Sequence, residues 1–223
     1  MDFKIENGPV FTTLKVELQH GESIKAEAGA MVAMSPTIEL KAKGSGKGIL
    51  GSLKAAVGGE ALFASVLTAE HGPGEIHLAP AVPGDIVQWN LGGQTVYAQS
   101  GAYLAGDPEL TLSTQGSLKA MISGEGLFLS KISGSGPLFL NSYGAVMSKD
   151  LAPGEEYIVD SGHIVAFEET VTYKIKKAAK GLFSTLASGE GLVCRYSGPG
   201  KIWMQTRNLS AFGQLLMPMV TKK

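Results

Sequence analysis

The sequence is poor in charge and almost without cysteine. Charged side chains make up 17% of the 223 residues, below the usual quarter, and 19 basic against 20 acidic groups leave a net charge of −1. Because such a chain has no long-range field for phosphates, we expect no nucleic-acid partner. The single cysteine, Cys194, can form no disulfide within the chain and excludes a cysteine-based zinc site, which fits a reducing compartment and a role as small core filler.

Long apolar runs and a secretory signal are also missing. The N-terminal residues lack a basic segment followed by an apolar run, so the sequence predicts a cytoplasmic protein. The most membrane-like window, residues 48–68, contains Lys54 and Glu60 and is interrupted by glycines, whereas a membrane-spanning helix needs about 20 mostly apolar residues. We therefore expect no transmembrane segment, and contact with a membrane surface is left open.

The residue patterns of common catalytic and metal sites are absent. The four histidines form no His-x-His or His-x₃-His pair, and no Gly-x-Ser-x-Gly sequence marks a nucleophilic serine. No nucleophile, base and orienting group can be named together, so the sequence predicts neither an enzyme nor a cofactor. The histidines are expected at the surface or in turns: His20, His71, His77 and His163.

Glycine, in contrast, is abundant, and the 30 glycines fall in repeated places. Residues 59–63 (GEALF) recur at 124–128 (GEGLF) and at 189–193 (GEGLV), with a spacing of 65 residues each time. A second block, residues 28–33 (AGAMVA), corresponds to 100–105 (SGAYLA) and 161–166 (SGHIVA). Matching blocks in the same order predict three copies of one unit.

Each unit shows the pattern of antiparallel strands. Leu14, Val16 and Leu18 alternate with charged residues, as half-buried strands do. Segments 49–57, 117–122 and 178–187 have short helical patterns. The predicted fold is mainly β: one domain over 1–223, with three pseudo-repeats of antiparallel strands and short helices closed around a pseudo-threefold axis. The repeats are expected at about 3–82, 83–152 and 153–212, followed by a tail over 213–223.

These blocks together resemble the family named for altered inheritance of mitochondria. The resemblance rests on Ala28-Gly29-Ala30-Met31, on the Gly-Glu-x-Leu-Phe hairpin and on the Pro-Gly-Glu/Asp turns, and it extends from about Phe3 to Phe212. It implies an all-β, internally triplicated domain without an established enzymatic activity, grouped with folds like the trp RNA-binding attenuation protein. It implies no catalytic residue, and a likeness of fold alone does not transfer RNA binding.

Two features suggest ligands. Residues 46–51 (GKGILG) spell G-x-G-x-x-G, but the strand expected before them, 37–43, alternates instead of being continuously apolar, and the equivalent loops lack the glycines. A flexible loop within the glycine cluster 44–51 is therefore the preferred interpretation. The second feature is a carboxylate in every unit, at Glu60, Glu125 and Glu190. Three carboxylates converging on an axis would bind a hard cation, although a structural role in the turns is the stronger hypothesis.

Three functions follow from these expectations. The first is a non-enzymatic scaffold that forms homo-oligomers through apolar strand faces and the apolar tail at 215–220, since low charge and high apolar content suit buried interfaces. The second is a small-ligand or cation-binding domain that uses the place where the units converge. The third, RNA binding by analogy of fold, is disfavoured by the net charge. The sequence identifies no protein partner.

Overall fold

The computed structural model describes residues 1–42, 64–115, 129–177 and 192–220, and these form strands joined by turns and one helix. The elements, in chain order, are β1 (Asp2–Glu6), β2 (Thr13–Leu18), β3 (Ser23–Glu27), β4 (Met31–Met34), β5 (Glu39–Ala42), β6 (Ala64–Thr68), β7 (Gly74–Leu78), β8 (Ile86–Gln99), β9 (Tyr103–Gly106), β10 (Thr111–Gln115), β11 (Leu129–Asn141), β12 (Val146–Leu151), β13 (Glu156–Asp160), β14 (Ile164–Glu168), β15 (Thr172–Lys177), β16 (Leu192–Ser197), β17 (Gly200–Gln205) and α4 (Leu209–Val220).

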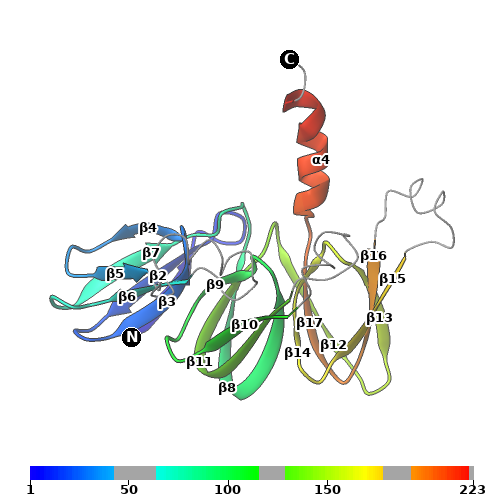
Figure 1. The fold of residues 1–223 in the computed structure, drawn as a ribbon, viewed down its shortest axis with the longest axis horizontal. Coiled ribbons are helices and arrows are strands. Elements are labelled where there is room, and N and C mark those ends of the chain that lie inside the picture. Colours follow the sequence, from blue (N-terminus) through cyan, green and yellow to red (C-terminus); the bar gives the residue numbers. More distant parts are fainter. Residues whose placement is uncertain (43–63, 116–128, 178–191, 221–223) are drawn as a thin grey trace.

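The strands form three antiparallel sheets. A four-stranded sheet has the order β1-β2-β7-β4, and a three-stranded sheet has the order β13-β16-β15. Between them runs a ten-stranded sheet, β12-β17-β14-β8-β11-β9-β3-β6-β5, with β10 on the side of β11. Figure 1 shows them as a row along the long axis of the molecule, from the N-terminal strands at one end to β13, β15 and β16 at the other.

The local sequence explains the strands well. In β2, Leu14, Val16 and Leu18 are buried while Glu17 points to solvent, so the predicted alternation is confirmed. Buried apolar residues form three clusters along the row: one around β2, β3 and β7, one around β8, β9 and β11, and one around β14, β16 and β17. The core is therefore divided along the chain, and most members of each cluster come from one successive stretch of it: 14–86, 91–140 and 151–204.

The mainly β fold is confirmed, but closure is not found. Among the described strands no sheet closes on itself. The end strands are β1 and β4 in the four-stranded sheet, β12 and β5 in the ten-stranded sheet, and β13 and β15 in the three-stranded sheet. Figure 1 places β4 and β13 at opposite ends of the row. In the described part of the chain, therefore, no strand pairing produces the expected closure around an axis. The expected short helices at 49–57, 117–122 and 178–187 lie outside the described residues.

One glycine-rich segment forms a bulge, and the expected start of the tail differs from the structure. The Gly134-Ser135-Gly136 segment lies inside the continuous strand β11. The register of β11 against β8 shifts there, and both glycines have positive φ, so the extra residue is absorbed in a bulge. At the other end of the chain, the expected start of the tail at residue 213 falls inside α4, which begins at Leu209.

Candidate interaction surfaces

The candidate metal ligands from the sequence cannot be placed. Glu60, Glu125 and Glu190, and the glycine cluster 44–51, lie outside the described residues. Within residues 1–42, 64–115, 129–177 and 192–220, no three histidine, cysteine, aspartate or glutamate side chains gather as metal ligands would. The cation hypothesis therefore finds no support elsewhere in the described chain.

The Cys194 thiol lies in the core. Cys194 is fully buried on β16, and this burial raises its pKa to about 11. A thiol with so high a pKa carries almost no thiolate at neutral pH, and the thiolate is the nucleophile. The predicted role as core filler is confirmed.

The tryptophans likewise serve packing. Trp89 on β8 and Trp203 on β17 lie with ring centroids 4.1 Å apart, and both are partly buried against the central cluster. This contact joins the middle of the row to its C-terminal third. The two rings therefore cover each other and serve packing, instead of forming an open platform for bases.

A cavity of about 230 Å³ opens beside the base of α4. It is lined by Glu27 at the end of β3, by the turn after β8, by Asn141 and Tyr143, and by Gln205 and Leu209. The Asn141 side chain donates a hydrogen bond to the Gly101 carbonyl oxygen, and the Gln205 side chain donates one to the Gly162 carbonyl oxygen. The cavity therefore collects turns that are far apart in the sequence.

Glu27 has an unusual environment in this cavity. Burial raises the pKa of its carboxyl group above the ordinary value. No sequence pattern singles out Glu27, because this glutamate continues the alternation of apolar and polar residues in β3 as an exposed glutamate would. The structure alone shows that turns from distant parts of the chain surround it.

Exposed apolar side chains gather on two strands at the ends of the row. On β4, Met31, Val32 and Met34 are 39%, 63% and 38% exposed. On β13, Tyr157 and Ile158 are 40% and 56% exposed. Each of these strands is the last in its sheet, so its outer edge has no partner strand among the described residues. An apolar edge strand of this kind is a template for pairing with another chain.

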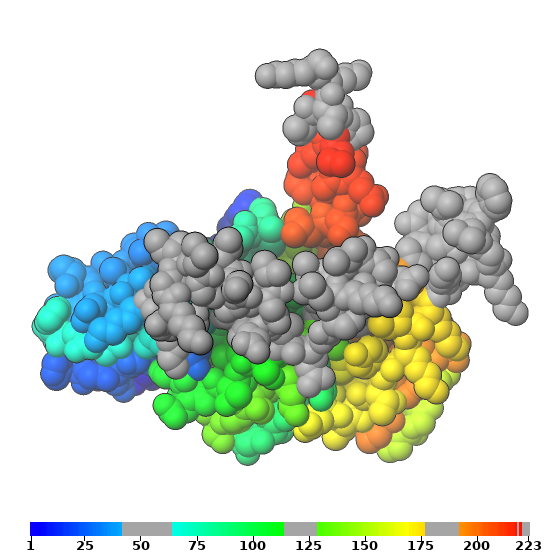
Figure 2. Space-filling model, in the orientation of Figure 1, coloured from blue at the N-terminus to red at the C-terminus, as the bar shows by residue number. Residues whose placement is uncertain are grey.

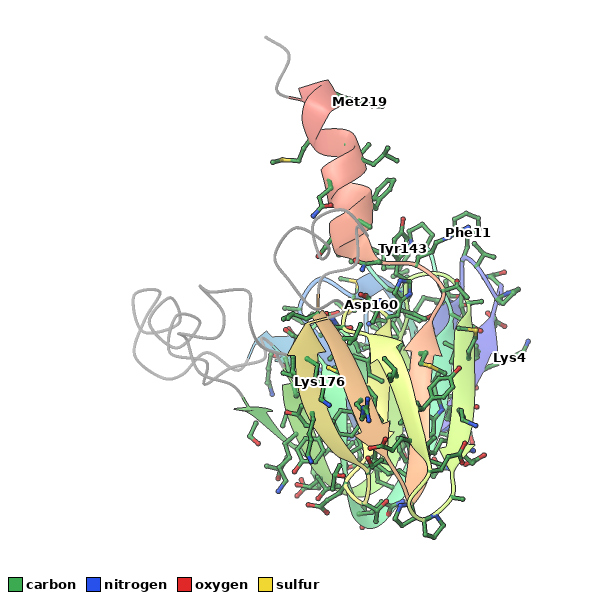
Figure 3. The ribbon with its side chains drawn as sticks, turned by 90° about the vertical axis from the view of Figure 1, so that its right-hand side faces the viewer. Lys4, Phe11, Tyr143, Asp160, Lys176 and Met219 are labelled. Carbon is green, nitrogen blue, oxygen red and sulfur yellow. The ribbon has the colours of Figure 1, made fainter. Side chains whose placement is uncertain are left out.

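The helix α4 is a third apolar surface. Large apolar side chains of the helix that are exposed include Leu209, Phe212, Leu215, Leu216, Met217 and Met219. The helix contains no charged residue, and it begins at an Asn208 cap, where the side-chain oxygen accepts a hydrogen bond from the Ala211 amide. Phe212 lies against Tyr143 with ring centroids 6.0 Å apart. Beyond this contact α4 stands away from the sheets (Figures 2 and 3), with Met219 near its far end.

The apolar C-terminal stretch was expected as an interface element, and its exposure agrees with that expectation without identifying a partner. Figure 3 also shows that Phe11, Tyr143 and Asp160 lie at the end of the body from which α4 rises. No helix among the described residues is long and apolar enough to cross a membrane.

A solved structure and a curated relative are similar to nearly the whole chain. The crystal structure of a Streptococcus pyogenes protein matches with a TM-score of 0.83 and 30% identity, covering 98% of this chain and 99% of that one. An uncharacterised protein of Streptococcus pyogenes serotype M6 is 32% identical over 225 residues, which is 97% of this chain and 90% of the relative. Neither match bears on the expected likeness to the attenuation-protein fold, which stays a prediction.

The family model agrees with the resemblance drawn from the glycine blocks. It carries the description "Mitochondrial biogenesis AIM24" and matches residues 3–207, from β1 to the residue before the Asn208 cap of α4. The helix thus lies beyond the matched region, while all three sheets lie within it. Because this match covers almost the whole chain, the protein belongs to the AIM24 family.

Proposed function

We propose that this protein is a non-enzymatic scaffold that associates with itself through exposed apolar surfaces. The observation that carries the proposal is the concentration of exposed large apolar side chains on α4 and on the edge strands β4 and β13. Large exposed apolar patches on a protein usually mark interaction sites, whereas single exposed apolar residues are ordinary.

We also propose that the scaffold consists of three repeated units. Each unit would contain one three-stranded arrangement of the same kind: β2-β7-β4, then β8-β11-β9, then β12-β17-β14. In each arrangement the third strand shows a register shift, which falls at Val32, Leu104 and Val165. The sequence blocks at 28–33, 100–105 and 161–166 place these three residues at equivalent positions, which supports the repeat.

Sedimentation velocity of the full chain tests the function. A self-associating scaffold is expected to sediment as a species heavier than the 23.3 kDa chain at micromolar concentration. The expected oligomer persists in high salt, because an apolar interface is not screened by ions. A strict monomer across the micromolar range would overturn the proposal.

A second candidate function uses the cavity beside α4. Its volume of about 230 Å³, its mixed lining and the partly buried Glu27 carboxyl group suit a small polar ligand. Thermal-shift measurements against metals, nucleotides and small metabolites test this candidate with the wild-type chain and Glu27→Gln. A ligand that raises the melting temperature of the wild type but not of Glu27→Gln supports binding at the cavity. An equal response of both chains places the ligand elsewhere.

A further inference from the structure

Two short strand pairings of the same kind connect neighbouring parts of the row, and each is called a joint below. The first joint pairs β3 with β9, with Ala26 opposite Ala105 and Lys25 opposite Gly106. The second pairs β8 with β14, with Ala98 opposite Ala166 and Tyr97 opposite Phe167. Both joints are antiparallel and short, and each connects strands that lie far apart in the sequence.

The two joints use equivalent positions. Ala105 and Ala166 each lie two residues after the start of their strand and directly after the register shift, and Ala33 occupies the same place in β4. On the other side of the joint, Ala26 and Ala98 each lie one residue before the end of their strand. Val159 occupies that place in β13. The strands β13 and β4 therefore carry the two halves of a third joint.

The exposure of these strands shows that the third joint is open. At the register shift, Leu104 and Val165 are 0% and 1% exposed, because a neighbouring strand covers them, whereas Val32 is 63% exposed. All four residues of β9 are buried, and all four of β4 are exposed. The residues of β4 are all apolar, as in a strand that a neighbouring strand buries, but in β4 they are all exposed. This combination is expected of a strand whose partner strand is missing.

One chain cannot close this joint by itself, because β4 and β13 lie at opposite ends of the row (Figure 1). We propose that β13 of one copy pairs antiparallel with β4 of a second copy, with Val159 opposite Ala33 and Ile158 opposite Met34. The proposal rests on the self-association proposed above and names its interface.

The side chains at the open joint suit this pairing. Ile158 and Met34 would take the places of Tyr97 and Phe167, whose rings stack with centroids 5.4 Å apart across the existing joint. Both are exposed and apolar, so their contact removes apolar surface from water at each end of the chain. Neither places a charge opposite a like charge.

A second kind of contact also repeats between distant parts of the chain. Phe11 and Gly84 form a parallel bridge, and Gly84 and Gly144 form another, so the three segments lie in line. Phe11 ends this line and is 71% exposed. In the proposed assembly Gly144 of one copy reaches Phe11 of the next, which continues the line. The association is head to tail, and such contacts give rings when the rotation closes and filaments when it does not.

Lysine substitutions test the interface, because a charge on either edge opposes pairing. Met34→Lys blocks the β4 edge and Ile158→Lys blocks the β13 edge, and each variant is expected to sediment as a monomer. The matched control is Met147→Lys, since Met147 is 48% exposed on another edge strand, β12. It is expected to keep the wild-type oligomer. Circular dichroism checks that each variant is folded.

Mixing the two blocked variants gives the sharpest result. The Met34→Lys chain retains a working β13 edge, and the Ile158→Lys chain retains a working β4 edge. An equimolar mixture is therefore expected to form a dimer of twice the chain mass and nothing larger. A mixture that stays monomeric, or that restores the full oligomer, would overturn the proposal.

Cysteine cross-linking tests the register without a destabilising charge. The only native cysteine is buried, so it does not compete. The double variant Met34→Cys/Ile158→Cys is expected to give a ladder of disulfide-linked chains on a non-reducing gel, since directly opposite residues lie within disulfide reach. The control Met147→Cys/Ile158→Cys is expected to stay monomeric on the gel. Absence of the ladder from an oligomeric protein would contradict the β13–β4 joint alone, whereas a monomeric wild type would contradict self-association as well.

Discussion

At the scale of single residues, Glu27 connects local burial to stability. Burial raises the pKa of its carboxyl group in the folded protein. The folded state therefore binds this proton more tightly than the unfolded state does, so the contribution is present at low pH and is lost as the pH rises through the raised pKa. Ionised Glu27 thus opposes folding at neutral pH.

We predict that Glu27→Gln stabilises the protein at neutral pH. The amide stays uncharged, so the variant avoids the cost of burying a carboxylate. Its melting temperature is expected to exceed that of the wild type at pH 7 by about 2 °C, the size of a modest change at a partly buried position. The gain is expected to vanish near pH 4. Thermal melts at both pH values measure it, with the exposed Glu109→Gln as the control; a gain independent of pH would contradict the explanation.

Phe167 is the centre of a ring cluster in the C-terminal core. Its ring centroid lies 5.4 Å from that of Tyr97 and 5.3 Å from those of Tyr173 and Tyr196, and its side chain is fully buried. We predict that Phe167→Ala lowers the free energy of unfolding by about 3–5 kcal/mol, because the cavity is lined by rigid rings. Urea denaturation measures the loss. The Tyr97→Phe control keeps the ring and is expected to cost far less, and equal costs would argue against ring packing.

At the scale of elements, α4 is weakly attached. Near its first turns the Phe212 ring lies against Tyr143 and Leu209 lines the cavity. Its remaining apolar surface is exposed, and exposed apolar surface adds little to folding stability. The helix therefore serves a surface role more than a folding role.

We predict that a chain ending at Arg207 folds and assembles without α4. Its melting temperature is expected to fall by no more than about 2 °C, the size of a surface change. Retention on a phenyl column is expected to drop, because six exposed apolar side chains are removed. The number of copies in the oligomer is expected to stay the same by light scattering. Loss of the oligomer in this variant would make α4 the interface instead of the strand edges.

The elements also show what the sequence can predict. The alternation in β2 is a local property, so it identified a half-buried strand correctly. The exposure of β4 is not local: its residues repeat the pattern of β9, yet β9 is covered by β3 while β4 has no covering strand among the described residues. In the same way, the glycines at 134 and 136 fit a turn or a bulge equally well, and only the pairing with β8 decides between them.

The candidate site follows the same rule. The apolar character of residues 215–220 was readable in the sequence, and their exposure agrees with an interface role. The environment of Glu27 depends on turns near residues 100, 141 and 205, which no spacing in the sequence brings together. The ends of β4 and β13 became candidate surfaces only once the strand order was known.

At the scale of the whole molecule, the row of sheets ends in two unlike edges. Natural β proteins protect edge strands with charge, proline or a covering element, because bare edges pair with other chains. Here β4 is apolar along its length, and β13 exposes Tyr157 and Ile158. The unpaired apolar edges of β4 and β13 are therefore better explained as the two sides of a contact between copies of the chain than as surface exposed to water.

This arrangement predicts that stability depends on protein concentration. Only the folded chain presents both edges, so assembly stabilises folding by mass action. A tenfold rise in concentration is expected to raise the wild-type melting temperature by about 4 °C, since one joint per chain contributes about 1.4 kcal/mol for each factor of ten. The Met147→Lys control should show the same rise. The Met34→Lys chain lacks the β4 edge, so its melting temperature is expected to be independent of concentration; a parallel rise in Met34→Lys would mean that the chains assemble through another surface.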